Sequence, residues 1–164
     1  MLLKLYKSSA RFLAFLTLST LTLSACSTFS PRTTSGASSS PKIAHFKNDI
    51  SVGSEDISIA AIGLVGVPYR YGGNTPAGGF DCSGLIVYVF NKSSGIKLPR
   101  TIQQMSNVGK GIGQQAPAPG DLVFFNTTGE RYSHAGIYVG KGRFVHAPSA
   151  GGTVRLDRID TPYW

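Results

Sequence analysis

The chain has 164 residues, of which 41% are apolar and 15% are charged, and its formal net charge is +8. This length and the seven Tyr and nine Phe suffice for one domain with its own core, and they exclude a wholly disordered or coiled-coil chain. Two cysteines are too few for a disulfide-rich scaffold. The composition favours one globular domain, and the positions of Cys26 and Cys82 become the informative detail.

The N-terminus has the pattern of an exported protein. Residues 1–25 carry three basic side chains and no acidic one, and their apolar run over 12–23 is short for a membrane span. The Leu-Ser-Ala-Cys sequence that ends at Cys26 resembles the bacterial lipobox, which implies cleavage before Cys26 and lipid on its thiol. Stable membrane attachment would follow, and Ser27 implies sorting to the outer membrane of the cell envelope. A plain secretory signal with a chance cysteine is the alternative.

Residues 26–53 are predicted to form a flexible tether after the lipidated cysteine. Ser, Thr, Pro and Gly dominate residues 27–40, and such a segment buries too little apolar surface to offset its ordering entropy. We therefore expect no fold before about Ser54 and a single domain over 54–164. In that domain ten Lys and Arg oppose seven Asp and Glu. The resulting +3 is too weak and too scattered for a nucleic-acid partner.

The first part of the domain is predicted to be helical. Ser54, as a capping hydroxyl with two acids behind it, begins an apolar pattern that predicts a helix over about 55–65. Apolar positions at helical spacing predict a second helix over 80–90, although the β-branched residues within it would also allow a strand. A third, short helix is predicted over 101–108.

After Pro119 the periodicity changes to short apolar runs bounded by Gly, Asn, Ser or Pro. These runs predict an antiparallel sheet of at least four strands over 122–125, 135–140, 143–147 and 154–159. Because the helices come first and the strands second, the predicted fold class is α+β.

Cys82 is a candidate nucleophile. If Cys26 carries lipid, Cys82 is a lone thiol in an oxidising compartment, where such a thiol is either buried or chemically used. Its place at the start of a predicted helix would lower its pKa through the helix dipole and free N–H groups. Gly84, a poor helix residue, indicates that another backbone or a ligand approaches closely.

Histidines could supply the base that a thiol nucleophile needs. His45 falls in the predicted tether and is set aside, which leaves His134 and His146. If their strands form a hairpin closed at 140–142 with even register, both side chains lie on one face with Cβ atoms about 5–8 Å apart. One imidazole could then accept the proton while the other orients it. Structural or surface roles for each histidine are the alternative.

Two other kinds of site are less consistent with the sequence. Cys82 with the two histidines could bind zinc, but no second thiol and no closely spaced ligand pair accompanies them. The glycines over 72–79 could suggest a phosphate loop, but no Gly-Lys-Ser/Thr sequence follows them. We expect no cofactor and no metal.

A series of short motifs resembles the NlpC/P60 family of cell-wall peptidases, in order and over about residues 55–164. The motifs are Pro-Tyr-Arg-Tyr-Gly-Gly from Pro68, Phe-Asp-Cys-Ser-Gly from Phe80, Leu-Pro-Arg-Thr from Leu98, Pro-Gly-Asp-Leu-Val-Phe-Phe from Pro119, His-Ala-Gly-Ile-Tyr from His134 and Phe-Val-His-Ala from Phe144. The resemblance implies a papain-like fold in which helices pack on an antiparallel sheet. It also implies a final strand beyond Trp164, which this chain would lack.

The resemblance also implies roles for individual residues. Cys82 is the expected nucleophile, His134 the general base and acid, and His146 the third, orienting residue. Tyr69 matches a tyrosine whose hydroxyl lies by the nucleophile and could contribute to an oxyanion site, although a half-buried aromatic is the alternative. Three further positions are expected to line the cleft and hold substrate amine and carboxylate groups: Asp81, Ser83 and Arg100.

The function implied is a lipid-anchored cysteine endopeptidase that hydrolyses amide bonds in peptidoglycan stem peptides or cross-links, beside a D-amino acid or diaminopimelate. Its expected partners are peptidoglycan peptides as substrate and a membrane through the N-terminal lipid, and the sequence leaves its oligomeric state open. A non-catalytic wall-binding lipoprotein and an acyltransferase or amidase on the same scaffold are the alternatives.

Overall fold

A computed structural model describes residues 42–45, 53–113 and 115–164. The predicted signal sequence over 1–25, Cys26 and most of the predicted tether lie outside the described residues, so lipid attachment stays a prediction. Among the described residues, no helix has the length and apolar character needed to cross a bilayer.

Three helices form where the sequence pattern predicts them: α1 over Ser54–Ile62, α2 over Cys82–Ser94 and α3 over Ile102–Val108. The side chain of Thr101 accepts a hydrogen bond from the Gln104 N–H and caps α3. The expected cap of α1 was wrong, because Ser54 lies inside the helix and its N-cap, Gly53, provides no side-chain hydrogen bond. At the C-terminal end of α2, Gly95 takes a left-handed conformation and ends the helix.

The described strands form a fully antiparallel six-stranded sheet in the order β4-β1-β5-β6-β7-β8. The strands are β1 over Lys42–His45, β4 over Lys110–Gly111, β5 over Leu122–Phe125, β6 over His134–Gly140, β7 over Arg143–His146 and β8 over Arg155–Arg158. Four of them match the predicted strands within two residues. A separate two-stranded sheet pairs β2, Asn74–Thr75, with β3, Gly79–Phe80.

Strand β1 corrects the predicted tether and domain boundary. Residues 42–45 belong to the sheet, where they pair with β5 on one side and with β4 on the other. Ala44 is fully buried against the main core, and Lys42 donates a hydrogen bond to the carbonyl of Ser106 in α3. His45, set aside because of its predicted place in a tether, is in fact part of β1. The sequence does not reveal this strand because four residues beside a Ser-rich stretch carry no periodicity.

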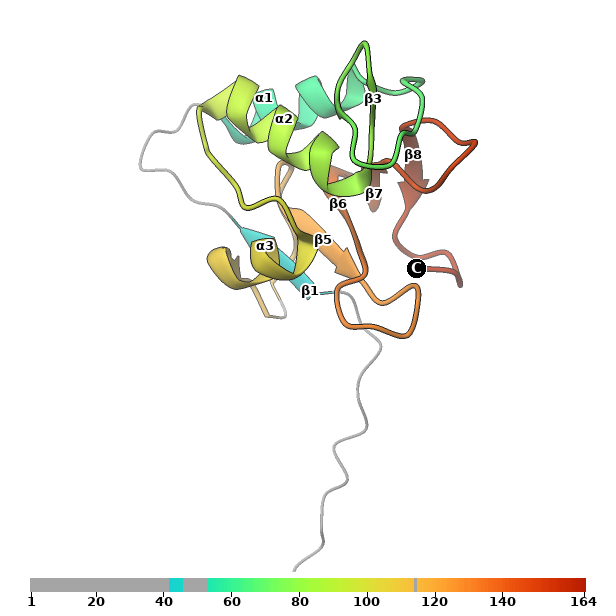
Figure 1. The fold of residues 1–164 in the computed structure, drawn as a ribbon. Coiled ribbons are helices and arrows are strands. Elements are labelled where there is room, and N and C mark those ends of the chain that lie inside the picture. The colour runs from blue at the N-terminus through green and yellow to red at the C-terminus, as the bar shows by residue number, and fades with distance from the viewer. Residues whose placement is uncertain (1–41, 46–52, 114) are drawn as a thin grey trace, which may run out of the picture. The chain divides into compact units, whose positions relative to one another are not determined.

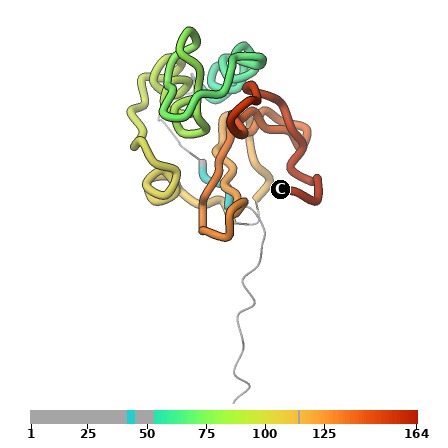
Figure 2. Tube along the Cα trace, turned by 45° about the vertical axis from the view of Figure 1, so that its right-hand side comes forward, coloured from blue at the N-terminus to red at the C-terminus, as the bar shows by residue number. Residues whose placement is uncertain are grey.

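The two faces of the sheet have different coverings. On one face of the sheet, α1 and α2 pack together and against β6 (Figure 1). The main core lies between these helices and the sheet and includes Phe124, Ile137 and Val145. On the other face Val123, Phe125, Tyr138 and Phe144 form a second apolar cluster that Trp164 covers. In Figure 2 the C-terminal segment, coloured dark red, returns beside the sheet. The α+β prediction, with helices packed on an antiparallel sheet, is confirmed.

Candidate functional site

Cys82 is the first residue of α2, and the preceding residue, Asp81, caps that helix. Asp81 has an extended backbone, and its Oδ1 accepts a hydrogen bond of 2.6 Å from the Gly84 N–H. This bond satisfies an N–H group that has no partner within the helix and fixes where the helix begins. The cap therefore places the thiol of Cys82 in the first turn of a buried helix.

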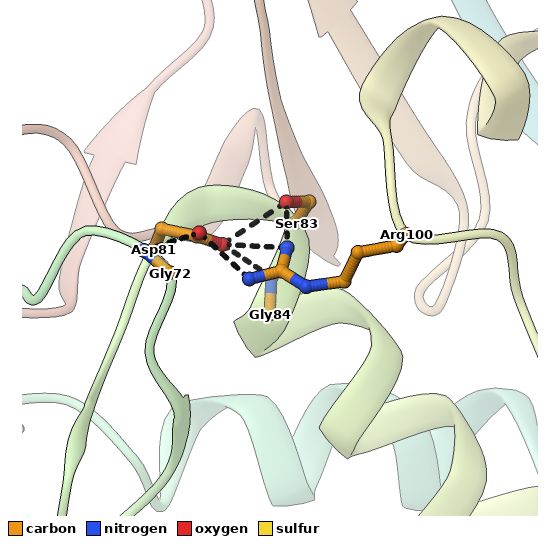
Figure 3. Close-up of polar contacts among 5 residues, drawn as sticks. All are labelled: Gly72, Asp81, Ser83, Gly84 and Arg100. Atoms are coloured by element: carbon orange, nitrogen blue, oxygen red, sulfur yellow. Dashed lines mark hydrogen bonds and ion pairs between the residues drawn. The ribbon is translucent and has the colours of Figure 1, made fainter.

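The Asp81 carboxylate is the centre of a hydrogen-bond network (Figure 3). Arg100 donates to Oδ1 at 3.0 Å and to Oδ2 at 2.8 Å, and the Gly72 N–H donates to Oδ2 at 2.9 Å. The Ser83 hydroxyl donates to Oδ1 at 3.0 Å and also lies against an Arg100 nitrogen. Burial alone would raise the pKa of Asp81, but the hydrogen bonds from Arg100, Gly84 and Ser83 outweigh it and hold the pKa below its usual value.

The three residues predicted to line the cleft, Asp81, Ser83 and Arg100, are thus brought together. The same network ties the loop at Gly72 and the segment before α3 to the first turn of α2. Both carboxylate oxygens of Asp81 are already engaged by protein donors. Asp81 therefore positions the nucleophile's helix, whereas the side chain of Arg100, 43% exposed, can also face a ligand.

The prediction that a backbone closely approaches Gly84 is confirmed. A Cβ atom at Gly84 would lie 2.0 Å from the carbonyl oxygen of Gly73, a distance no real side chain tolerates. Asp81 also donates its N–H to that carbonyl. Glycine at position 84 lets the loop over 70–79 lie directly on the first turn of α2. Beside this contact is an open hollow of about 290 Å³, whose lining is Arg70, Tyr71, Gly72, Gly73, Asn74, Thr75 and Gly78.

The environment of the Cys82 thiol contradicts the expected low pKa. Burial of the thiol, followed by the negative charge of Asp81, raises the pKa of Cys82 above its usual value. The N–H groups of Ser83 and of Cys82 itself act in the opposite direction without reversing the shift. Desolvation and the charge of the capping carboxylate therefore raise the thiol pKa more than the helix N-terminus lowers it. Cys82 holds its proton at neutral pH and needs a base to remove it.

Tyr69 lies in the same cluster as the thiol. Its N–H donates a hydrogen bond of 2.8 Å to the carbonyl of Gly152, and its half-buried ring packs against the main core. Burial, followed by the nearby Cys82 and Asp81, raises the pKa of its hydroxyl. The hydroxyl is thus protonated and lies near Cys82, and its contribution to an oxyanion site stays a prediction.

His134 and His146 form a buried pair, as the hairpin argument predicts. His134 begins β6 and His146 ends β7, where the register places His146 opposite Gly136 and on the same face as His134. The Nε2 atom of His134 is 2.9 Å from the Nδ1 atom of His146. Their exposures are only 6% and 0%. A Cβ atom at Gly136 would lie 2.5 Å from the ring of Phe144 and 2.8 Å from the carbonyl oxygen of Val145, so only glycine lets β7 pack this closely beside His134.

Both imidazoles are neutral at physiological pH. Burial, and then the adjacent His146, lowers the pKa of His134 to about 3. Burial also lowers the pKa of His146 to about 4, and the nearby Asp157 only partly opposes this shift. A neutral imidazole has one nitrogen with a lone pair and can accept a proton. Within the described residues, the Nδ1 atom of His134 has no hydrogen-bond partner, so this nitrogen is the free position of the pair.

The sequence reasoning missed the residues that enclose the histidine pair. Asp157 in β8 places Oδ2 3.1 Å from the Nε2 atom of His146, and Trp164 stacks on His134 with ring centroids 5.3 Å apart. Arg155 and Trp164 donate hydrogen bonds to the same Asp157 oxygen. The charged residues of β8 are the available signal in the sequence, but such residues are equally typical of an exposed edge strand.

Comparison with known proteins covers most of the described domain. The model of the NlpC/P60 family matches residues 66–164, more than half of the chain. The chain belongs to the NlpC/P60 family. Its relatives include the gamma-DL-glutamyl hydrolase of Bacillus subtilis, which is 48% identical over 61% of this chain and 24% of the relative. The probable endopeptidase NlpC of Escherichia coli is 41% identical over 60% of this chain and 64% of that protein.

The fold is also that of solved NlpC/P60 structures. The crystal structure of the NlpC/p60 domain of the peptidoglycan hydrolase SagA matches with a TM-score of 0.61 and 31% identity, covering 68% of this chain and 94% of that domain. The chain spans between about a quarter and two thirds of the length of the two curated relatives above. The comparisons thus establish the family and the fold.

In this NlpC/P60 domain the thiol and the histidine pair lie on different elements that pack together. α2 begins with Cys82 and packs against β6, which begins with His134. No hydrogen bond joins the thiol to an imidazole within the part of the chain that the structure describes. The structure therefore contains two groups of candidate catalytic residues. One is the protonated thiol of Cys82 near Tyr69, Asp81 and Arg100, and the other is the neutral pair of imidazoles.

The buried histidines make the stability of the domain depend on pH. Their folded pKa values, about 3 and about 4, lie below the unfolded value near 6.5, so between these limits the unfolded chain binds more protons. We expect the free energy of unfolding to fall by several kcal/mol between pH 6.5 and 4, measured by denaturant titration. Asp81 and Asp157, with lowered pKa values, lose their contributions only at lower pH. A double His134→Gln, His146→Gln variant should flatten this dependence, and a flat wild-type curve would contradict the burial argument.

Proposed function

We propose that this NlpC/P60 protein is a cysteine endopeptidase that hydrolyses amide bonds of peptidoglycan peptides, with Cys82, His134 and His146 as its triad. The observation that carries the proposal is the neutral, buried histidine pair, in which one nitrogen of His134 is free and His146 engages the other. The free nitrogen of a neutral imidazole can accept a proton and later return it, and the thiol of Cys82 is the candidate nucleophile. Two similar proteins, a peptidoglycan hydrolase and a probable endopeptidase, are named for the same chemistry and support it.

In the proposed reaction the Nδ1 atom of His134 takes the proton of the Cys82 thiol as Sγ forms a bond to the substrate carbonyl carbon. The negative oxygen that develops is stabilised by the Cys82 N–H and the Tyr69 hydroxyl. His134 then returns the proton to the leaving amine as the C–N bond breaks, leaving a thioester. Water, deprotonated by His134, attacks this thioester and releases a carboxylic acid and the free thiol.

Substrate binding would use the surroundings of Arg100. Its guanidinium is 43% exposed and lies near the thiol, and the loop over 70–79 lines an open hollow. A guanidinium suits the carboxylates of a stem peptide. Hydrolysis of such a substrate would take place in the cell envelope, in line with the predicted export signal. No metal or cofactor has a role in the proposed reaction.

The test is digestion of purified sacculi by the protein, with the released peptides identified by mass spectrometry. We expect new peptide termini at one type of amide bond, and their identity distinguishes a γ-D-glutamyl bond from a cross-link. Intact sacculi after incubation with folded protein would contradict the proposal. Binding without release would favour the wall-binding alternative, and transfer products would favour an acyltransferase.

A further inference from the structure

Asp157 lies at one end of a line of polar groups that runs through both histidines. Its Oδ2 atom is 3.1 Å from His146 Nε2, and His146 Nδ1 is in turn 2.9 Å from His134 Nε2. Asp157 is on β8, next to β7, and its side chain is 21% exposed, whereas that of His146 is 0% exposed. The line thus connects the surface of an edge strand to His134, the proposed base.

Among the described residues, the groups that hydrogen-bond or ion-pair with Oδ2 of Asp157 are all nitrogens that can donate a proton. Arg155 donates to Oδ2 through Nε at 3.1 Å and Nη2 at 2.9 Å, and the indole of Trp164 donates to it at 3.3 Å. These donors fix the carboxylate in its ionised form, because an ionised carboxylate only accepts. The Nε2 atom of His146 is buried and lies 3.1 Å from Oδ2 of Asp157, although no hydrogen bond of regular geometry reaches it among the described residues. A nitrogen that faces a carboxylate is stabilised when it carries the proton.

We propose that Asp157 is a positioning residue that sets the tautomers of both histidines and thereby leaves a lone pair on Nδ1 of His134. With the proton of His146 on Nε2, its Nδ1 must accept a hydrogen bond, so the proton of His134 lies on its Nε2. The lone pair of His134 then lies on Nδ1, the atom without a partner. This inference rests on the proposed function only for its consequence in catalysis, since the tautomers exist without substrate.

The first experiment reads the tautomers directly. In long-range ¹H–¹⁵N spectra of the labelled protein at neutral pH, we expect both imidazole protons on Nε2. In Asp157→Ala, a fraction of His146 should move its proton to Nδ1, and His134 should respond. A wild-type protein with the His146 proton on Nδ1, or unchanged tautomers in the variant, would overturn the proposal. This readout stands even if the protein does not cleave sacculi, an outcome that would overturn only the proposed function.

The second experiment separates positioning from structural support. Asp157→Ala should lower kcat about tenfold with little change in KM, because the fraction of His134 in the competent tautomer falls. Asp157→Asn keeps an oxygen that can accept from His146 and should restore part of the rate. The control is Asp160→Ala, which removes the same type of Arg–Asp pair two residues apart, here with Arg158, away from the histidines. Equal losses in the Asp157→Ala and Asp160→Ala variants, or no gain in Asp157→Asn, would contradict the proposal. If the Asp157→Ala protein does not fold, the kcat and tautomers of Asp157→Asn decide.

Discussion

Replacing Cys82 by Ala should reduce the release of peptides from sacculi by about a thousandfold or more. Cys82 is the only free cysteine among the described residues, so its removal leaves no thiol there to form the acyl intermediate. The same loss is expected for Cys82→Ser, because a hydroxyl of similar size is far harder to deprotonate. Circular dichroism and thermal unfolding should show both variants folded, since the side chain is only partly buried at the edge of the core.

The histidine variants should rank in a defined order. His134→Ala should match the loss in Cys82→Ala because it removes the base, whereas His146→Ala should lose most of the rate while leaving a base in place. Each truncation leaves a cavity beside Trp164, which contacts both histidines. Because such a cavity can destabilise the domain, the thermal unfolding of each variant must be measured together with its rate. Full activity of a folded His134→Ala protein would contradict the proposed triad.

The resting state of the thiol gives an independent check on these variants. Because burial and Asp81 raise the pKa of Cys82 and because His134 is neutral, we expect a protonated thiol beside a neutral imidazole, not an ion pair. Alkylation by iodoacetamide should therefore be slow at pH 6 and accelerate only toward alkaline pH. Rapid alkylation below pH 7 would show that a thiolate–imidazolium pair exists at rest.

Gly84→Ala should destabilise the domain by about 3 kcal/mol and abolish activity together with the fold of the site. The new methyl group would lie 2.0 Å from the Gly73 carbonyl oxygen, and that atom is backbone, which cannot rotate away. The loop over 70–79 would have to lift off α2 and break the bond between the Asp81 N–H and Gly73. Denaturant titration measures the loss.

The matched control for this substitution is Gly111→Ala. A Cβ atom at Gly111 meets nothing within 4 Å, so the free energy of unfolding should stay within about 0.5 kcal/mol of the wild-type value. If the Gly84→Ala protein is as stable as this control, the loop over 70–79 can move away from α2 at little cost in free energy, which would contradict the close-packing argument.

Local patterns in the sequence were sufficient for the elements that carry strong periodicity or punctuation. The helix that begins at Cys82, the strands at β5 to β8 and the shared face of His134 and His146 all follow from short-range rules of spacing and register. The close approach at Gly84 also follows locally, because glycine destabilises a helix and its presence in the first turn indicates that a larger side chain would not fit. The motifs that resemble the NlpC/P60 family lie in these same segments, and the family match agrees.

Strand β1 and the thiol pKa depend on tertiary neighbours. Four residues in a polar stretch become a strand only because β4 and β5 offer them hydrogen bonds and a core position for Ala44. The helix terminus argued for an acidic thiol, but a pKa sums burial and every nearby charge, and Asp81 must lie beside Cys82 to cap the helix.

By itself, the sequence determined the order of the elements, the candidate nucleophile and the two candidate histidines, because each depends on residues close together in the chain. The fold alone decided that the thiol rests protonated, that Asp81 is saturated by donors, and that Asp157 and Trp164 enclose the histidine pair. These properties depend on burial and on contacts between segments distant in sequence, which exist only once the sheet and helices have packed.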